Sequence, residues 1–205
     1  MSGAERAKTR VMKREAVLEA AASEFNERGY HRTSVEDIAK RLNISKPTVY
    51  YYIGKKEDIL LEVQRGVLEQ MLRQIKANMS KHRTAEARLR WLINFWVKQV
   101  CSETGMAFVR VPEFELPEHL AHEVRTYKRN IQEIFIDTLR LGVTDGSLNI
   151  SDPVLSTFLL AGSLNAVGTW YENGRGWTPT KIAKRLTEIL LQGVADKQAP
   201  TAQAE

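Results

Sequence analysis

Two helix starts separated by eleven positions constrain this chain more than any other feature of its sequence. Ser34 is followed by acidic residues, so a side-chain cap is combined with favourable charge in the first helical turn. Ser45 opens a second helix, with Pro47 at an early position where its missing N–H costs little. Between them Asn43 can adopt the left-handed conformation that ends the first helix. The spacing predicts two short helices joined by a tight turn within residues 34–52.

Hydrophobic spacing elsewhere also follows a helical period. Val17, Ala21 and Phe25 form one apolar stripe, which Gly29 ends. No segment combines alternating β-branched residues with hairpin signals, so the sequence predicts an all-α fold of about nine helices. The expected helices cover about residues 10–28, 34–43, 45–52, 55–80, 84–103, 105–111, 117–142, 152–173 and 178–194. Residues 1–9 are expected to fray, and 196–205 to form a disordered tail.

The amino-acid composition argues against a membrane protein and against a secreted, disulfide-linked one. Hydrophobic residues make up 43% of the 205 residues, enough for a sizeable core. No apolar run reaches the roughly 18 residues of a membrane span, and the N-terminus lacks the apolar region of a signal peptide. The single cysteine, Cys101, excludes an internal disulfide framework and fits a reducing compartment. These features indicate a cytoplasmic protein that makes no use of a membrane.

The excess positive charge is confined to the first quarter of the chain. Residues 1–56 hold 12 lysines and arginines against 7 acids, a difference equal to the net charge of +5 of the whole chain. The remaining residues are balanced. This asymmetry indicates a polyanionic partner for the N-terminal segment.

The second short helix carries side chains suited to nucleic acid. From Asn43 to Lys56 there is no acid, and the side chains expected on the surface are Lys46, Thr48, Tyr50, Tyr51, Tyr52, Lys55 and Lys56. Three consecutive tyrosines cannot all be buried, since successive side chains point around a helix. A helix-turn-helix with this surface suits the major groove of double-stranded DNA. A generic three-helix bundle with a surface aromatic cluster is the alternative.

Residues 21–60 resemble the DNA-binding segment of the tetracycline-repressor (TetR) family. The matching positions are Phe25, Gly29, Tyr30, Thr33, Ser34, Ile38, Ala39, Ser45, Lys46, Thr48, Tyr50, Gly54, Lys56, Glu57 and Leu60. Asn43 stands where the family usually has glycine, and Ile53 where it usually has phenylalanine. The resemblance implies a DNA-binding domain over 1–56 and a ligand-binding and dimerisation domain over 57–195.

The same resemblance implies roles for individual segments. Contacts with base edges or phosphates are implied for Lys46, Thr48, Tyr50, Tyr51 and Tyr52, and phosphate contacts for Thr33, Ser34 and Lys56, with Ser45 and Lys55 in the same surface. A homodimer is implied, in which the helices near 152–173 and 178–194 pair with their symmetry mates. The dimer would read a palindromic operator, act as a repressor and be released by a small-molecule inducer.

A ligand cavity is expected in the second domain, which is rich in aromatic residues. These are Trp91, Phe95, Trp96, Phe108, Phe114, Tyr127, Phe135, Phe158, Trp170 and Tyr171. Aromatic residues can line a cavity, but most lie in ordinary core or interfaces. The stretch 165–193 resembles the TetR subgroup that senses acyl-coenzyme A thioesters, although Ala166 stands where that subgroup often has tryptophan. The ligand-binding residues expected on this basis are Trp91, Phe95, Phe108, Arg110, Arg125, Tyr127, Lys128, Asn165 and Trp170.

Coenzyme A would need cations beside an apolar channel. Arg125, Lys128 and Arg129 share one helix face, which suits phosphates but could equally be a solvated face. Arg110 lies among apolar neighbours and could point into a cavity, or pair with a nearby acid such as Glu113.

Three rival functions follow from other features. An enzyme would need a nucleophile motif or a phosphate-binding loop, and neither is present around Cys101 or elsewhere. Glu115, His119 and His122 could hold a metal, although such histidines are more often unligated. The other rivals are a ligand-independent architectural DNA-binding protein and a regulator that senses a hydrophobic or aromatic ligand other than a coenzyme A thioester. We expect no enzymatic activity, no cofactor and no resident metal.

Overall fold

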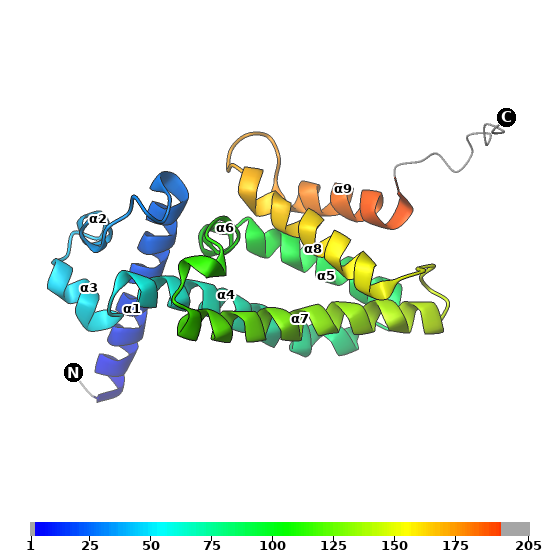
Figure 1. The fold of residues 1–205 in the computed structure, drawn as a ribbon, viewed down its shortest axis with the longest axis horizontal. Coiled ribbons are helices and arrows are strands. Elements are labelled where there is room, and N and C mark those ends of the chain that lie inside the picture. The colour runs from blue at the N-terminus through cyan, green and yellow to red at the C-terminus, as the bar shows by residue number, and fades with distance from the viewer. Residues whose placement is uncertain (1–2, 194–205) are drawn as a thin grey trace.

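The computed structural model describes residues 3–193, and this range is built of helices (Figure 1). Within it the α-helices are α1 (Gly3–Arg28), α2 (Val35–Arg41), α3 (Lys46–Tyr52), α4 (Lys56–Asn78), α5 (Ala85–Val100), α6 (Glu103–Arg110), α7 (Glu118–Thr144), α8 (Pro153–Trp170) and α9 (Pro179–Gln192). Two 3₁₀ turns, η1 (Met79–Lys81) and η2 (Glu113–Glu115), connect them. The all-α prediction is confirmed for the described range. The tail predicted at 196–205 lies outside it.

The helix signals at 34–47 act as predicted. Ser34 accepts a hydrogen bond from the Asp37 N–H, while the Asp37 carboxylate accepts one from the Ser34 N–H at 2.8 Å. Ser45 caps α3 by accepting from the Thr48 N–H. Asn43 has φ of 52°, which supplies the left-handed residue of the turn.

Three predicted helix ends are wrong by three residues or more. They are the start of α1, the end of α8, and the end of α5, which lies at Val100 instead of residue 103. The first helix begins at Gly3 instead of Arg10, because residues 4–16 are mostly alanine, lysine, arginine and glutamate, all strong helix formers. Helix α8 ends at Trp170 instead of residue 173. There Tyr171 turns to an extended conformation, its ring is buried, and its carbonyl accepts a hydrogen bond from Arg110.

One hydrophobic core runs through the whole described chain. The apolar faces of α1, α2 and α3 pack around Phe25, Ile38 and Val49, which are almost completely buried. The same cluster continues along α4 and into the helices from α5 to α9. Helix α4 therefore belongs both to the N-terminal bundle and to the larger C-terminal bundle, where it packs against α7 (Figure 1).

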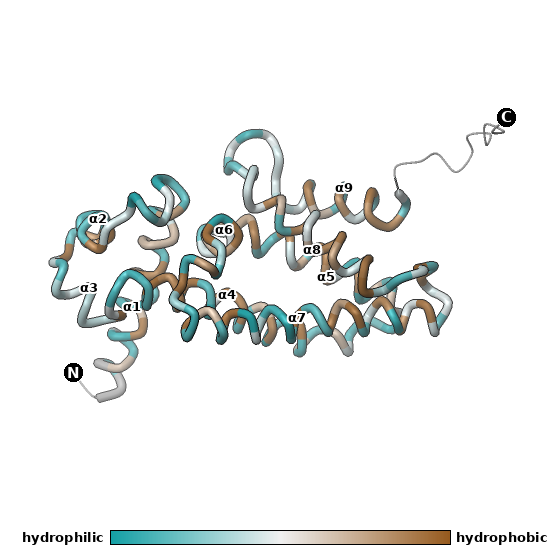
Figure 2. The backbone as a smooth tube through the Cα atoms, in the orientation of Figure 1, coloured by the Kyte–Doolittle hydropathy of each residue, from teal (hydrophilic) through white to brown (hydrophobic). Residues whose placement is uncertain are grey.

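Helix α8 differs from the others in having no charged residue along its length. Figure 2 shows hydrophobic stretches on α8 and α9, at the edge of the C-terminal bundle. Among the described helices, none is long and apolar enough to cross a membrane.

The corner between α5 and α6 is too tight for any side chain at Gly105. A Cβ there would lie 1.9 Å from the Gln99 carbonyl oxygen, a backbone atom that cannot move aside. Gly105→Ala should lower the free energy of unfolding by about 1–3 kcal/mol. Gly66→Ala, on the exposed face of α4 with open space around it, should raise it by up to about 1 kcal/mol through helix propensity. Urea denaturation of both variants checks the corner, and an unchanged midpoint for Gly105→Ala would contradict it.

Candidate DNA-binding surface and ligand cavity

Helix α3 presents a surface of cationic and phenolic side chains. Val49 is fully buried and anchors the helix, which leaves Lys46, Tyr50 and Tyr51 exposed on its outer side. Tyr51 is 67% exposed, and its ring packs edge-on against the half-buried Tyr52 at 5.2 Å. These groups can donate hydrogen bonds to phosphates and base edges.

The start of α3 carries paired hydroxyls. The Ser45 and Thr48 side-chain oxygens lie 2.7 Å apart, with Ser45 exposed and Thr48 half-buried. Because the same Ser45 oxygen also caps the helix, these hydroxyls are held in a fixed orientation at the helix N-terminus. They lie next to the exposed Lys46.

Thr33 does not reach the surface, which corrects the expected phosphate contact. Its side chain is 2% exposed, and its hydroxyl donates to backbone carbonyls that include Gly29 at 3.0 Å. It ties the end of α1 to the start of α2. Ser34 is exposed, but its hydroxyl lies 2.6 Å from the Asp37 carboxylate. That contact lowers the pKa of Asp37, so its acid stays ionised at the helix start.

The two lysines after α3 have different surroundings. Lys55 is exposed, and its N–H donates to Asp58. Lys56 is half-buried, with its ammonium 4.1 Å from the centroid of the Tyr30 ring and 3.5 Å from the His31 carbonyl oxygen. Burial lowers the pKa of Lys56. Lys55 is thus available to a ligand, whereas Lys56 fastens α4 to the turn after α1.

An ion-pair network holds α2 against α1. The Arg41 guanidinium donates to Glu24 at 2.9 Å and to Glu27 at 2.6 Å. The hydrogen bond from Arg41 lowers the pKa of Glu27 despite the opposing effect of desolvation. This network fixes the platform from which α3 projects.

Arg10 also belongs to this surface, although it was not among the predicted DNA-binding residues. Its guanidinium lies 5.5 Å from the centroid of the Tyr51 ring, so α1 approaches the exposed side of α3. Arg10 already lies at the first position of the predicted helix 10–28, and the packing of α1 beside α3 brings it to Tyr51. Helix-forming residues before the apolar stripe place Arg10 on a helix, but they do not reveal this contact.

A cavity of about 240 Å³ lies between α5, α6, α7 and α8. Its apolar lining is Trp96, Phe108, Ile131, Phe135, Phe158, Ala161 and Leu164, and its polar lining is Lys128, Gln132, Thr157 and Asn165. Typical pockets for drug-sized molecules hold roughly 300–1,000 Å³. This cavity can therefore enclose one apolar end of a larger molecule.

Two polar contacts shape the lining. The Trp96 indole N–H donates to the Asn165 side-chain oxygen at 3.0 Å, which fixes both groups. The Lys128 ammonium lies 5.2 Å from the centroid of the Phe108 ring and pairs with Glu113 on η2. Burial alone would raise the pKa of Glu113, but the hydrogen bond and charge of Lys128 keep it below its usual value. Lys128 is the ammonium group beside the cavity.

Only three of the nine expected ligand-binding residues line this cavity: Phe108, Lys128 and Asn165. Trp91 and Phe95 stack on each other at 5.0 Å elsewhere on α5. Tyr127 donates to Glu69 and Arg125 pairs with Glu118, while Trp170 is 53% exposed. Arg110 forms neither of the contacts weighed for it. It donates to the Gly168 and Tyr171 carbonyls and so binds the end of α6 to the end of α8.

The outer face of α8 and α9 is apolar, and no other segment within residues 3–193 covers its exposed side chains. Its exposed large side chains include Leu155, Phe158, Leu159, Trp170 and Ile189. Gly162, in the middle of the α8 face, has open space where a side chain would stand. Exposed apolar patches of this kind mark interaction surfaces.

The residues considered for catalysis or metal binding are placed in surroundings that do not suit either role. Burial raises the pKa of the Cys101 thiol to about 11, which makes it a poor nucleophile. Glu115 pairs with His31 at 2.8 Å, and His119 and His122 are exposed. Between residues 3 and 193, no cluster of three or more potential metal-ligating side chains occurs.

Comparison with known proteins assigns both halves of the chain to one family. Residues 17–63 match the family model described as bacterial regulatory proteins, tetR family. Residues 82–194, more than half of the chain, match the model described as tetracyclin repressor-like, C-terminal domain. The predicted resemblance to TetR regulators is confirmed.

Individual relatives extend the match over nearly the full chain. The transcriptional repressor KstR2 of Rhodococcus jostii is 27% identical over 188 residues, covering 89% of this chain and 91% of the relative. The fatty acid metabolism regulator protein of Bacillus subtilis is 22% identical, covering 88% and 95%. The structure of the ketosteroid transcriptional regulator KstR2 of Mycobacterium tuberculosis has the same fold, with a TM-score of 0.81 at 21% identity, covering 90% of this chain and 96% of that one. The chain belongs to the TetR family of transcriptional regulators, a family of DNA-binding proteins and not of enzymes.

Proposed function

We propose that this protein is a cytoplasmic repressor that binds a palindromic operator as a homodimer and is released by an amphipathic anionic ligand. The outer side of α3 is the main support for the proposed DNA binding. There Lys46, Tyr50 and Tyr51 stand exposed on a helix held by the buried Val49. A protruding helix with these groups fits the major groove, and paired copies fit two half-sites about 34–36 Å apart.

The face of α8 and α9 supports the dimer. Four-helix bundles pack apolar faces, and small residues let two helices approach closely. Leu155 and Leu159 on the exposed side of α8 would supply the apolar contacts, and Gly162 the close approach. This is the pairing that the family resemblance implies.

The cavity supports an amphipathic ligand. Its volume of about 240 Å³ and its aromatic lining suit an acyl chain or ring system. Lys128, 34% exposed at its side chain, offers a cation to an anionic group that stays outside. An acyl-coenzyme A thioester combines these features. The regulation of fatty acid metabolism named for the Bacillus subtilis relative fits this class. An uncharged hydrophobic or aromatic ligand is the alternative.

The turn η2 offers a route from the cavity to the DNA-binding helices. Glu113, at its start, pairs with Lys128 beside the cavity. Glu115, at its end, pairs with His31 in the turn between α1 and α2. An anionic ligand that attracts Lys128 competes with Glu113, which loosens η2 and thereby the Glu115–His31 contact.

Release then follows from thermodynamic linkage. A ligand that prefers the conformer with displaced recognition helices lowers operator affinity by its differential affinity for the two conformers. A difference of about 3 kcal/mol lowers operator affinity by roughly 100-fold.

Lys46→Ala tests the DNA-binding surface. Loss of the ammonium should weaken binding to the operator, and if it contacts a phosphate the salt dependence should become shallower by about 1 per protomer. Titrations of an operator duplex at several salt concentrations measure both quantities. Lys76→Ala, an exposed lysine on α4 remote from α3, serves as the control and should behave like the wild type. Equal affinity of Lys46→Ala and the wild type would contradict the assignment.

Lys128→Gln tests the ligand class. This change should leave operator binding intact and raise the dodecanoyl-coenzyme A concentration needed for release, because the thioester's phosphates lose their cation. Lys98→Gln removes an exposed lysine of α5 outside the cavity and should have no effect. Release by dodecanol as effective as by the thioester would favour the uncharged ligand. If neither compound released the protein from the operator, the proposal of a ligand-responsive repressor would be contradicted.

A further inference from the structure

The first half of α1 buries none of its described side chains. The first buried residue of this helix is Val17, yet the helix begins at Gly3. The intervening segment adds about 20 Å of helix at 1.5 Å per residue. Most helical stability comes from packing an apolar face, and this segment has little such packing. Its surface therefore serves some purpose other than the core.

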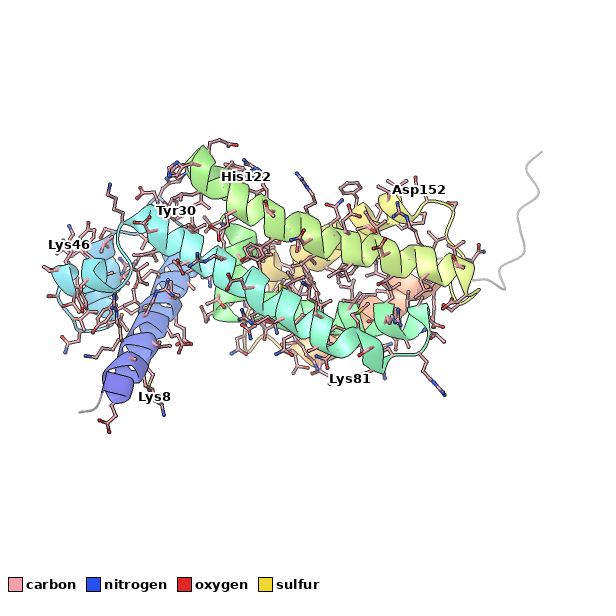
Figure 3. The ribbon with its side chains drawn as sticks, turned by 90° about the horizontal axis from the view of Figure 1, so that it is seen from below. Lys8, Tyr30, Lys46, Lys81, His122 and Asp152 are labelled. Atoms are coloured by element: carbon pink, nitrogen blue, oxygen red, sulfur yellow. The ribbon has the colours of Figure 1, made fainter. Side chains whose placement is uncertain are left out.

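We propose that this segment, residues 3–16, is a second DNA-contacting surface that binds backbone phosphates flanking each operator half-site. The proposal rests on the function proposed above, since it requires α3 to occupy the half-site. Figure 3 shows Lys8 of this segment and Lys46 of α3 at the same end of the molecule. The Arg10–Tyr51 contact joins this segment to the surface of α3.

Two contacts fix the orientation of the segment. The Arg10 guanidinium lies over the exposed ring of Tyr51 on α3, 5.5 Å from its centroid. Arg14, one turn later on the same side, pairs with Glu62 on α4. These contacts hold one face of α1 beside the recognition helix.

Helical register places a further cation near that face. Lys13 is exposed and lies about 60° around the helix from Arg10, whereas Lys8 is exposed about 160° away. Arg10 and Lys13 thus extend the positive surface of α3 along α1, and Lys8 points elsewhere. A row of cations that continues past a recognition helix complements the phosphate backbone, which continues past the half-site.

The pair Lys13 and Lys8 gives a matched test. Both are exposed lysines on the same helix, so replacing either by alanine changes the net charge equally and leaves helix propensity favourable. The probes are two duplexes with the same palindromic operator, one with ten base pairs of flanking DNA on each side and one trimmed to the half-sites. Circular dichroism melting confirms that each variant is folded.

Lys13→Ala should lower affinity for the flanked duplex severalfold and make its salt dependence shallower by about 1.8, which is 0.9 for each of two protomers. On the trimmed duplex it should match the wild type. Lys8→Ala should match the wild type on both duplexes.

Equal effects of the two substitutions, or a wild type indifferent to trimming, would overturn the proposal while leaving operator recognition by α3 intact. Failure of the wild type to bind any palindromic duplex would instead refute the proposed function, and this surface with it.

Discussion

The placement of α4, the helix shared by the two halves, depends on one buried hydrogen bond to the segment after α6. Gln64, in the middle of α4, is fully buried, and its side-chain N–H donates to the Val111 carbonyl just after α6 at 2.6 Å. Around it α4 contributes to a core that is continuous from the N-terminal helices to the ligand cavity. Apolar contacts alone would let α4 slide along its neighbours, because they have no preferred direction. A hydrogen bond requires a particular geometry and so fixes the position of the helix. The Gln64 side-chain oxygen accepts no hydrogen bond from the described residues.

The electrostatics of the junction act on the same elements. Burial, together with the charges of Glu57 and Glu115, raises the pKa of Tyr30 to about 12. Glu115 thus influences Tyr30 as well as His31, while Lys56 lies over the Tyr30 ring. The side chain of Asn26 on α1 donates to Glu103 at the start of α6, a further polar contact between the halves. The junction is a set of few, specific polar contacts around an apolar centre. Such an arrangement favours discrete alternative states over continuous deformation.

Most of the fold could be predicted because helix caps and turn residues are recognisable from short stretches of sequence. The caps at Ser34 and Ser45 and the left-handed Asn43 depend on neighbours within four residues, and all three form as the sequence indicates. The functional site was less predictable, because the type of a residue does not determine whether its side chain points to the surface, the core or a cavity. Thr33 matches the family pattern but points inward, and Trp91 and Phe95 stack on each other instead of lining the cavity. Lys128 and Glu113 meet only because α7 returns past η2, a contact that spacing along the chain does not reveal.

The proposed mechanism depends on η2, which would couple the ligand cavity to the DNA-binding helices, and this coupling can be measured directly. Operator affinity would be measured with and without saturating dodecanoyl-coenzyme A, for the wild type and for Glu115→Ala. Glu118→Ala, which removes a more exposed acid just beyond η2, is the control. We expect the ligand to lower the operator affinity of the wild type and of Glu118→Ala by roughly 100-fold. For Glu115→Ala, the ligand should lower operator affinity by less than about tenfold. This variant should still bind the ligand measurably in the absence of DNA. If the ligand lowered the operator affinity of Glu115→Ala as much as that of the wild type, coupling through η2 would be contradicted.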